Sequence, residues 1–211
     1  MHPQLHGLYA ITDPTLATEN NLQTQVREAL EGGARIIQYR DKGNDEPRRQ
    51  AEAEQLQALC KNHGALFIIN DDLALATAIK ADGLHLGRDD TDLDKARRIL
   101  GPKAIIGVSC YNELQRAKAA QAAGADYVAF GRFFPSNTKP QAIQAEIALL
   151  QQAKQELKIP IVAIGGITPE NGAPLVQAGA DMLAVIQGVF AQSDIRRACQ
   201  EFAILFEDSN Q

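Results

Sequence analysis

Cysteine is scarce in this sequence of 211 residues, and apolar runs long enough to cross a membrane are missing from it. The three cysteines (Cys60, Cys110 and Cys199) are odd in number and far apart, which argues against a disulfide framework or a zinc cluster. They fit the reduced thiols of a cytoplasmic protein. The N-terminus has no basic segment followed by an apolar one, so we expect no signal peptide.

Cations are too few for non-specific binding to nucleic acid. The net charge is −5, whereas contacts with a phosphate backbone need an excess of Lys and Arg. An anionic small molecule is still compatible with this charge, because local cations decide its binding. The sequence has no Walker lysine motif, no dinucleotide fingerprint and no apparent Ser-His-Asp or Cys-His set. His85 falls inside an expected strand, and we interpret it as a satisfied rim or core histidine.

What the sequence does contain is an alternation of strand and helix patterns along its whole length. Strands are expected at 8–12, 35–40, 66–69, 83–86, 104–108, 127–130, 161–164 and 182–186. Helices are expected at 21–30, 46–62, 73–80, 92–100, 112–123 and 143–157, again from about 169, and finally from the last strand to about 206. Most of the strands are apolar on both faces, as in parallel sheets that helices cover. Eight such units predict a single, compact (β/α)8 TIM barrel over residues 1–211.

Short segments of small residues recur between a helix and the strand that follows it. They are found at 33–35, 81–83, 124–126 and 179–181. A small residue there lets the chain turn back beneath a barrel. We interpret these segments as stability features of the bottom face, with no role in function.

Polar residues gather instead in the loops that follow the strands. These are Gln38, Arg40 and Lys42; Asn70 and Asp71; Asp89 and Asp90; Ser109; Ser136, Thr138 and Lys139; Gly165 and Gly166; and Ile186, Gln187 and Gly188. All strands of a parallel barrel point one way, so these loops open on the one face where barrel enzymes have their active sites. This asymmetry is the main evidence for a site.

The polar row in 38–42 has the period of a strand. Gln38 and Arg40 therefore point to the same side, and Lys42 continues the row. An arginine facing into a barrel needs a ligand or a partner carboxylate. An Arg–Asp pair inside the rim is one explanation, but we favour an anion held by Arg40 and Lys42.

Two carboxylates follow consecutive strands. Neighbouring strands lie about 4.8 Å apart, so Asp71 and Asp90 are able to share one hard cation, and Mg²⁺ is the expected ion. Asp89 is an alternative to Asp90. Aspartate is also favoured at helix N-caps, and this is the explanation that we accept for Asp72, whereas for Asp71 and Asp90 we favour metal binding over capping.

Phosphate-binding features occupy two other parts of the same face. The loop after residue 131 holds the hydroxyls of Ser136 and Thr138, the amide of Asn137 and the cation of Lys139, between two prolines. Taken alone, it would be read as an ordinary solvated turn. Gly165-Gly166 and Ile186-Gln187-Gly188 follow the last two strands, where barrels commonly bind phosphate through backbone N–H groups.

Together these motifs resemble one family. The matching blocks are Leu8-Tyr9-Ala10-Ile11-Thr12-Asp13, Gln38-x-Arg40-x-Lys42, Asn70-Asp71, Gly83-Leu84-His85-Leu86-Gly87-x-x-Asp90, Gly107-Val108-Ser109, Phe134-Pro135-Ser136-x-Thr138-Lys139 and Ala163-Ile164-Gly165-Gly166-Ile167. In this order, over nearly the whole chain, they resemble thiamine-phosphate synthases. That family joins hydroxymethylpyrimidine diphosphate to a thiazole phosphate or its carboxylated form, releasing pyrophosphate.

The resemblance implies a role for each matching position. Gln38, Tyr39, Arg40, Asp41, Lys42, Asn70, Ser109 and Lys139 would hold the pyrimidine diphosphate, with Arg40, Lys42, Ser109 and Lys139 as catalytic residues; Asp71 and Asp90 would bind Mg²⁺; and Ser136, Asn137, Thr138, Gly166, Ile186 and Gln187 would hold the thiazole phosphate. Ser136 stands where threonine is common and keeps the hydroxyl. Gln187 stands where serine is frequent; this matters little if backbone N–H groups hold the phosphate there, whereas a contact made by a hydroxyl would be lost. The implied mechanism is dissociative and needs no general base, because a nitrogen lone pair captures the cation.

Three other functions remain compatible with parts of this pattern. A thiazole tautomerase shares the barrel and the phosphate loops, but is not expected to keep the full set of cations and Mg²⁺ ligands. Another phosphate-binding barrel isomerase would need an acid–base pair, which the sequence does not show. A ligand-sensing barrel would catalyse nothing. We expect small-molecule substrates, no nucleic acid and no membrane, and a homo-oligomer stays open.

Overall fold

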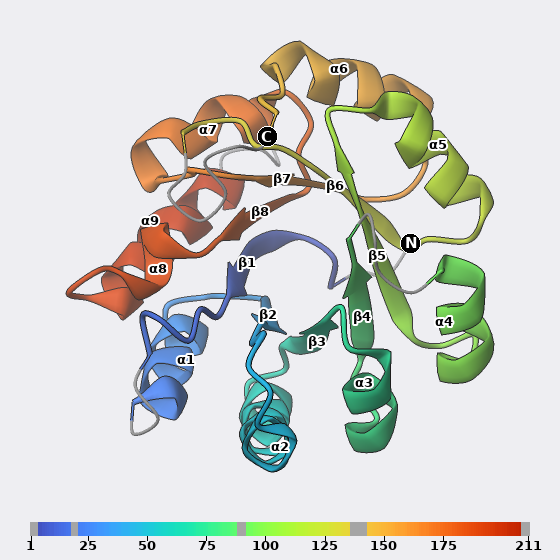
Figure 1. The fold of residues 1–211 in the computed structure, drawn as a ribbon. Helices are drawn as coiled ribbons and strands as arrows, with labels where there is room; N and C mark the ends of the chain where they lie inside the picture. Colours follow the sequence, from blue (N-terminus) through green and yellow to red (C-terminus); the bar gives the residue numbers. More distant parts are fainter. Residues whose placement is uncertain (1–3, 18–20, 88–91, 136–142, 208–211) are drawn as a thin grey trace.

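The computed structural model describes residues 4–17, 21–87, 92–135 and 143–207, which form eight strands and nine helices (Figure 1). The strands are β1 (Gly7–Ile11), β2 (Ile36–Tyr39), β3 (Leu66–Asn70), β4 (Gly83–Leu86), β5 (Ile105–Tyr111), β6 (Tyr127–Phe130), β7 (Ile161–Ile164) and β8 (Met182–Val185). The helices are α1 (Leu22–Glu31), α2 (Glu46–Asn62), α3 (Leu73–Ile79), α4 (Leu93–Leu100), α5 (Leu114–Ala122), α6 (Ile147–Glu156), α7 (Pro169–Gln177), α8 (Gln187–Phe190) and α9 (Ile195–Glu207).

The strands close into a parallel barrel in chain order. Each strand pairs in parallel with the next, and β1 also pairs with β8, where Gly7 lies opposite Met182. The helices surround this ring of strands (Figure 1). The predicted (β/α)8 barrel is therefore confirmed, and all strand ends that carry the polar residues meet on one face.

Strand alternation divides the core into an inner and an outer layer. On β1, Tyr9 and Ile11 belong to the cluster inside the barrel, whereas Leu8 and Ala10 belong to the cluster beneath the helices. The inner layer holds apolar residues such as Ile68 and also two buried tyrosines, one of them Tyr9. Burial on both faces explains why the strands are apolar at successive positions.

Aspartates in the repeated small-residue segments stabilise the bottom of the barrel. The carboxylates of Asp82, Asp126 and Asp181 accept hydrogen bonds of 2.8, 2.8 and 2.9 Å from the backbone N–H groups of Phe67, Ile106 and Ile161, respectively. Each bond satisfies an N–H group at the start of a strand that precedes the aspartate in the chain. The structure thus gives these residues a structural part, as the sequence predicted.

Two predicted helices are wrong in detail. Residues 143–146 do not belong to α6, because the carbonyl of Ile143 and the N–H of Ala145 bind the backbone of Arg132 instead. The final helix is two helices, α8 and α9. A new N-terminus forms where the Asp194 carboxylate accepts from the N–H of Arg197, at 2.9 Å.

No helix in the described part of the chain combines the length and the apolar character that crossing a membrane requires.

Candidate active site

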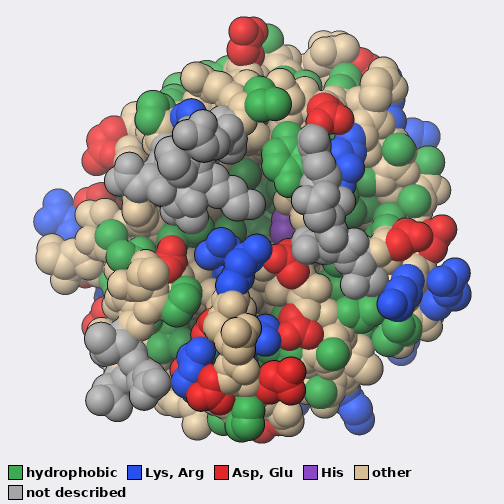
Figure 2. Space-filling model, in the orientation of Figure 1, with side chains coloured by type: hydrophobic (Ala, Val, Ile, Leu, Met, Phe, Trp, Pro, Cys, Tyr) green, Lys and Arg blue, Asp and Glu red, His purple; other side chains and the backbone are tan. Residues whose placement is uncertain are grey.

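A cavity of about 500 Å³ opens at the carboxyl ends of the strands. Figure 2 shows this face, with a hollow near its middle and both basic and acidic side chains beside it. Among the described residues, the cavity is lined by Tyr9, Ile11, Gln38, Arg40, Lys42, Asn70, Asp71, His85, Gly87, Ser109, Tyr111, Ala129, Gly131, Arg132, Pro135, Val162, Ile164, Gly165, Gly166, Ile167, Thr168, Ala184, Val185, Ile186, Gln187 and Gly188. The sequence predicted nine of these as site residues.

The end of β2 supplies the cations of this cavity. Gln38, Arg40 and Lys42 all line it, as the period-two row predicted. The backbone N–H of Arg40 donates to Thr12 Oγ1 at 3.0 Å, which fixes the end of β2 to β1. Within the described residues, Arg40 forms no ion pair, so the alternative of an internal Arg–Asp pair finds no support there.

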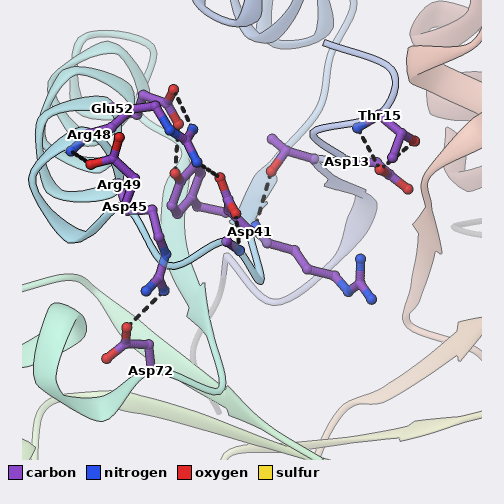
Figure 3. A network of polar contacts seen from close by, with 12 residues as sticks. Asp13, Thr15, Asp41, Asp45, Arg48, Arg49, Glu52 and Asp72 are labelled. Atoms are coloured by element: carbon purple, nitrogen blue, oxygen red, sulfur yellow. Dashed lines mark hydrogen bonds and ion pairs between the residues drawn. The ribbon is translucent and has the colours of Figure 1, made fainter. Parts of the chain in front are cut away.

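Tyr39 and Asp41 point the other way, toward α2. The Tyr39 hydroxyl donates to Glu52 at 2.6 Å, and Arg48 Nη2 lies 2.6 Å from the Asp41 carboxylate (Figure 3). Arg48 also binds Glu52 at 2.8 Å, so one guanidinium joins both acids. Neither Tyr39 nor Asp41 lines the cavity. Their predicted contact with substrate therefore gains no support from the side-chain geometry, and it stays a prediction.

The local charges keep Asp41 ionised. Burial opposes its charge, but the Gly43 N–H at 2.6 Å and the Arg48 guanidinium outweigh this and hold the pKa of Asp41 below its ordinary value. Its side chain is only 4% exposed, so the ion pair is almost out of water on the aspartate side. The pair connects the loop after β2 firmly to α2.

The adjacent residues Asp71 and Asp72 have different positions. Asp72 caps α3 by accepting from the N–H of Leu75 at 2.9 Å, as expected, and its other oxygen lies 2.8 Å from Arg49 (Figure 3). Asp71 caps no helix of the described ranges; it lines the cavity, with a carboxylate oxygen 3.4 Å from Lys42 Nζ. Its φ of 62° lies in the left-handed region, which aspartate tolerates better than most residues.

This position suits a hard cation. The Asp71 carboxylate faces the cavity beside Lys42, and Mg²⁺ typically takes one or two carboxylates while phosphate and water complete its shell. No group of three or more Asp, Glu, His or Cys side chains that is able to hold a metal occurs in the described ranges. The described residues therefore fit an ion that arrives with a phosphate ligand.

Polar side chains also fill the floor of the cavity, and the sequence did not single out the two tyrosines among them. His85 Nδ1 lies 3.0 Å from the Tyr127 hydroxyl, and His85 Nε2 lies 2.9 Å from Ser109 Oγ. The prediction of a satisfied rim histidine is thus confirmed, but the histidine is also part of the cavity wall. Tyr9 and Tyr127 occupy inward positions in the alternation of β1 and β6, and this was the signal in the sequence that identifies them. The strands were interpreted as simple apolar runs, so the signal was overlooked.

Glycines that follow β7 form the wall of the cavity opposite the cations at the end of β2. Gly165 and Gly166 have φ values of 104° and 63°, and a Cβ atom at Gly166 would lie 2.2 Å from the carbonyl oxygen of Pro135. Only glycine fits such a close approach. No hydrogen bond from within the described ranges engages the N–H of Gly166, so this donor is available to an anion.

The comparisons with known proteins agree with this geometry. Residues 8–189 match the family model described as "Thiamine monophosphate synthase". The chain belongs to this family. It is 54% identical over 210 residues to the thiamine-phosphate synthase of Nitrosococcus oceani, which covers 100% of this chain and 97% of the relative. It is 51% identical over 205 residues to that of Thioalkalivibrio sulfidiphilus, with 97% of each covered.

Solved structures of similar fold include a member of the same family. Thiamine phosphate pyrophosphorylase from Pyrococcus furiosus superimposes with a TM-score of 0.90 at 36% identity, covering 99% of this chain and 98% of that one. A (S)-3-O-geranylgeranylglyceryl phosphate synthase from Thermoplasma acidophilum has a TM-score of 0.71 at 19% identity, covering 96% and 94%. The second likeness shows the fold alone.

Several predicted site residues lie outside the described ranges. They are Asp89, Asp90, Ser136, Asn137, Thr138 and Lys139. Their roles stay predictions. The predicted thiazole-phosphate residues Ile186 and Gln187 do line the cavity, and the latter begins α8 with an exposed side chain.

Proposed function

We propose that this chain condenses 4-amino-2-methyl-5-hydroxymethylpyrimidine diphosphate with a thiazole phosphate, or its carboxylated form, to give thiamine phosphate and pyrophosphate. One observation carries the proposal beyond family membership. The same cavity is lined by Arg40 and Lys42 on one side and by the glycine wall of Gly165 and Gly166 on the other. Two anion-binding regions in one cavity suit a reaction between two phosphorylated substrates.

The diphosphate end of the pyrimidine substrate is assigned to the side of the cavity at β2 and β3. Arg40, Lys42 and Lys139 would neutralise the charge that develops on the leaving pyrophosphate, which is electrostatic stabilisation of the transition state. Asp71 and Asp90 would hold Mg²⁺. When bound, this ion supplies Lewis-acid stabilisation of the phosphate oxygens.

The pyrimidine ring is assigned to the floor, where Gln38, Asn70 and Ser109 line the cavity. The mechanism that we propose is dissociative. The bond between the methylene carbon and the diphosphate oxygen breaks, its electron pair leaves with pyrophosphate, and the electron-rich aminopyrimidine carries the positive charge. The lone pair of the thiazole nitrogen then forms the new C–N bond, and this step requires no general base.

The thiazole phosphate is assigned to the wall formed by the ends of β7 and β8. The N–H of Gly166, the backbone at Ile186 and Gln187, and the hydroxyls of Ser136 and Thr138 would bind it. Backbone donors account for phosphate binding without a hydroxyl at position 187, so the glutamine there is compatible with this role. We also propose a cytoplasmic location.

Pyrophosphate release measured with both substrates, with and without Mg²⁺, tests the proposal. We expect rapid release only when both substrates and the metal are present, together with formation of thiamine phosphate. Isomerisation of the carboxylated thiazole phosphate alone, without pyrophosphate, would identify a tautomerase instead. Binding of either substrate without any turnover would favour a sensing barrel.

A further inference from the structure

A chain of side-chain hydrogen bonds crosses the inside of the barrel from Gln38 to Ser109. Gln38 Nε2 donates to the Tyr9 hydroxyl at 2.7 Å, and this hydroxyl lies 2.8 Å from that of Tyr127. The Tyr127 hydroxyl lies 3.0 Å from His85 Nδ1, and His85 Nε2 lies 2.9 Å from Ser109 Oγ. Five strands, β1, β2, β4, β5 and β6, each contribute one member.

The amide of Gln38 gives this chain a direction. An amide nitrogen only donates, so the Tyr9 oxygen accepts from it and the Tyr9 proton is directed to Tyr127. Tyr127 then has its own proton for His85 Nδ1, which must accept. A neutral imidazole that accepts at Nδ1 carries its proton on Nε2 and donates it to Ser109.

The surroundings keep the two phenols protonated and in place. Tyr9 and Tyr127 are 1% and 0% exposed, and burial raises the pKa of each hydroxyl far above its ordinary value of 10.0. The ring of Tyr127 stacks on His85 with centroids 5.6 Å apart. It also occupies the space beside Gly107, where a Cβ atom would lie 1.9 Å from Tyr127 Cζ. The chain is therefore built into the packing of the barrel.

The two ends of the hydrogen-bond chain present opposite groups to the cavity, an acceptor at Gln38 and a donor at Ser109. Gln38 Nε2 donates to the Tyr9 hydroxyl, and Gln38 Oε1 receives no hydrogen bond from any described residue, so this oxygen is the acceptor that this end offers. Ser109 accepts from His85, so its own hydroxyl proton is directed to a ligand, and this end offers a donor. Both residues line the cavity.

We propose that Tyr9, Tyr127 and His85 are positioning residues that fix this polarity, so that the cavity selects a ring with a donor toward Gln38 and an acceptor toward Ser109. An aminopyrimidine has this pattern, since an exocyclic amine lies next to a ring nitrogen. The inference rests on the proposed function for the identity of the ring. The direction of the chain itself rests only on the unliganded protein.

The protonation of His85 tests that direction without substrate. The ¹⁵N chemical shifts of the imidazole distinguish a protonated nitrogen from a bare one. We expect a single neutral form with the proton on Nε2 in the wild type, and a mixture of both neutral forms in Tyr127→Phe. A proton on Nδ1 in the wild type would show that His85 donates to Tyr127, so that the hydrogen-bond chain has the opposite direction. This result would overturn the inference.

Substrate discrimination tests whether the hydrogen-bond chain selects the substrate ring. In Tyr9→Phe, the amide of Gln38 is free to turn, so the preference for the aminopyrimidine diphosphate over its oxo analogue in kcat/KM should fall about tenfold, as one lost hydrogen bond implies. Thr77→Val is the matched control, because it removes a hydroxyl bonded to Leu73 on α3, away from the cavity. Its preference should equal that of the wild type.

The outcomes separate this inference from the proposed function. An unchanged preference in a folded, active Tyr9→Phe variant would reject the positioning role while leaving the synthase activity intact. If the wild type released no pyrophosphate, the proposed function would fail, but the His85 spectrum would still decide the direction of the chain. Thermal melting of each variant establishes that it is folded.

Discussion

Arg48 Nη2 lies 2.6 Å from Asp41 Oδ2, so the first turn of α2 holds the loop that follows β2. The side chains of Arg40 and Lys42 point to the opposite side of the same short segment, into the cavity. The ion pair between Arg48 and Asp41 therefore holds this segment in place, and with it the two cations that line the cavity. Asp41 and Arg48 do not line the cavity, yet their ion pair influences where its cations lie.

Replacing Arg48 with methionine should lower both stability and activity. The Asp41 carboxylate, with a side chain 4% exposed, would lose its partner, which we expect to cost about 2 kcal/mol of unfolding free energy. Urea unfolding measures this loss. Arg197→Met is the control, since its pair with Glu201 is exposed and should contribute almost nothing. Equal losses in the two variants would contradict the argument.

Arg40 is expected to act on the reaction more than on the fold. Arg40→Ala and Lys139→Ala should each remove at least about 2 kcal/mol of transition-state stabilisation, because charge on the leaving pyrophosphate is left uncompensated. This is measured as the fall in kcat/KM for the pyrimidine diphosphate. The unfolding free energy of Arg40→Ala should stay close to that of the wild type. Turnover near the wild-type rate in either variant would reject its assigned role.

Asp71 and Asp72 separate metal binding from helix capping in neighbouring residues. Asp71→Asn should raise the Mg²⁺ concentration needed for half-maximal activity by tenfold or more with little loss of stability, because asparagine also tolerates the left-handed backbone. Asp72→Ala should instead cost at least about 1 kcal/mol of unfolding free energy, through the lost cap on α3 and the lost pair with Arg49, and leave the Mg²⁺ dependence unchanged. If Asp71→Asn lowered the stability and Asp72→Ala changed the Mg²⁺ dependence, the two assigned roles would have to be exchanged.

The sequence predicted the barrel and much of its rim because both depend on simple periodicities. Strand alternation placed Gln38, Arg40 and Lys42 on one side, and parallel strands brought them to the same face as Asp71. Helix boundaries were less predictable. The segment before α6 had helical character, but the backbone of Arg132 offered it two hydrogen bonds that no local pattern reveals.

Contacts between distant strands could not be predicted in this way. Tyr9 and Tyr127 are 118 residues apart in the chain, and each reads as an ordinary member of an apolar strand. Their hydroxyls meet only because the barrel closes. The alternation that identified Arg40 also places Asp41 on the opposite side, but the resemblance assigned Asp41 to the substrate, and its partner Arg48 on the next helix required the folded chain.

The three buried cysteines predict how stability changes with alkaline pH. Burial raises the pKa of Cys60, Cys110 and Cys199 from 9.0 to about 12. Between these values the folded chain keeps thiol protons that the unfolded chain has lost, so the unfolding free energy falls as pH rises, by up to about 1.4 kcal/mol per pH unit for each thiol. Well below pH 9 both states keep the thiol protons, so the thiols add no pH dependence there. Urea unfolding between pH 9 and 10 should show this decline, and Cys199→Ala should make it shallower by one thiol. An equally steep decline in Cys199→Ala would mean that this thiol ionises alike in both states.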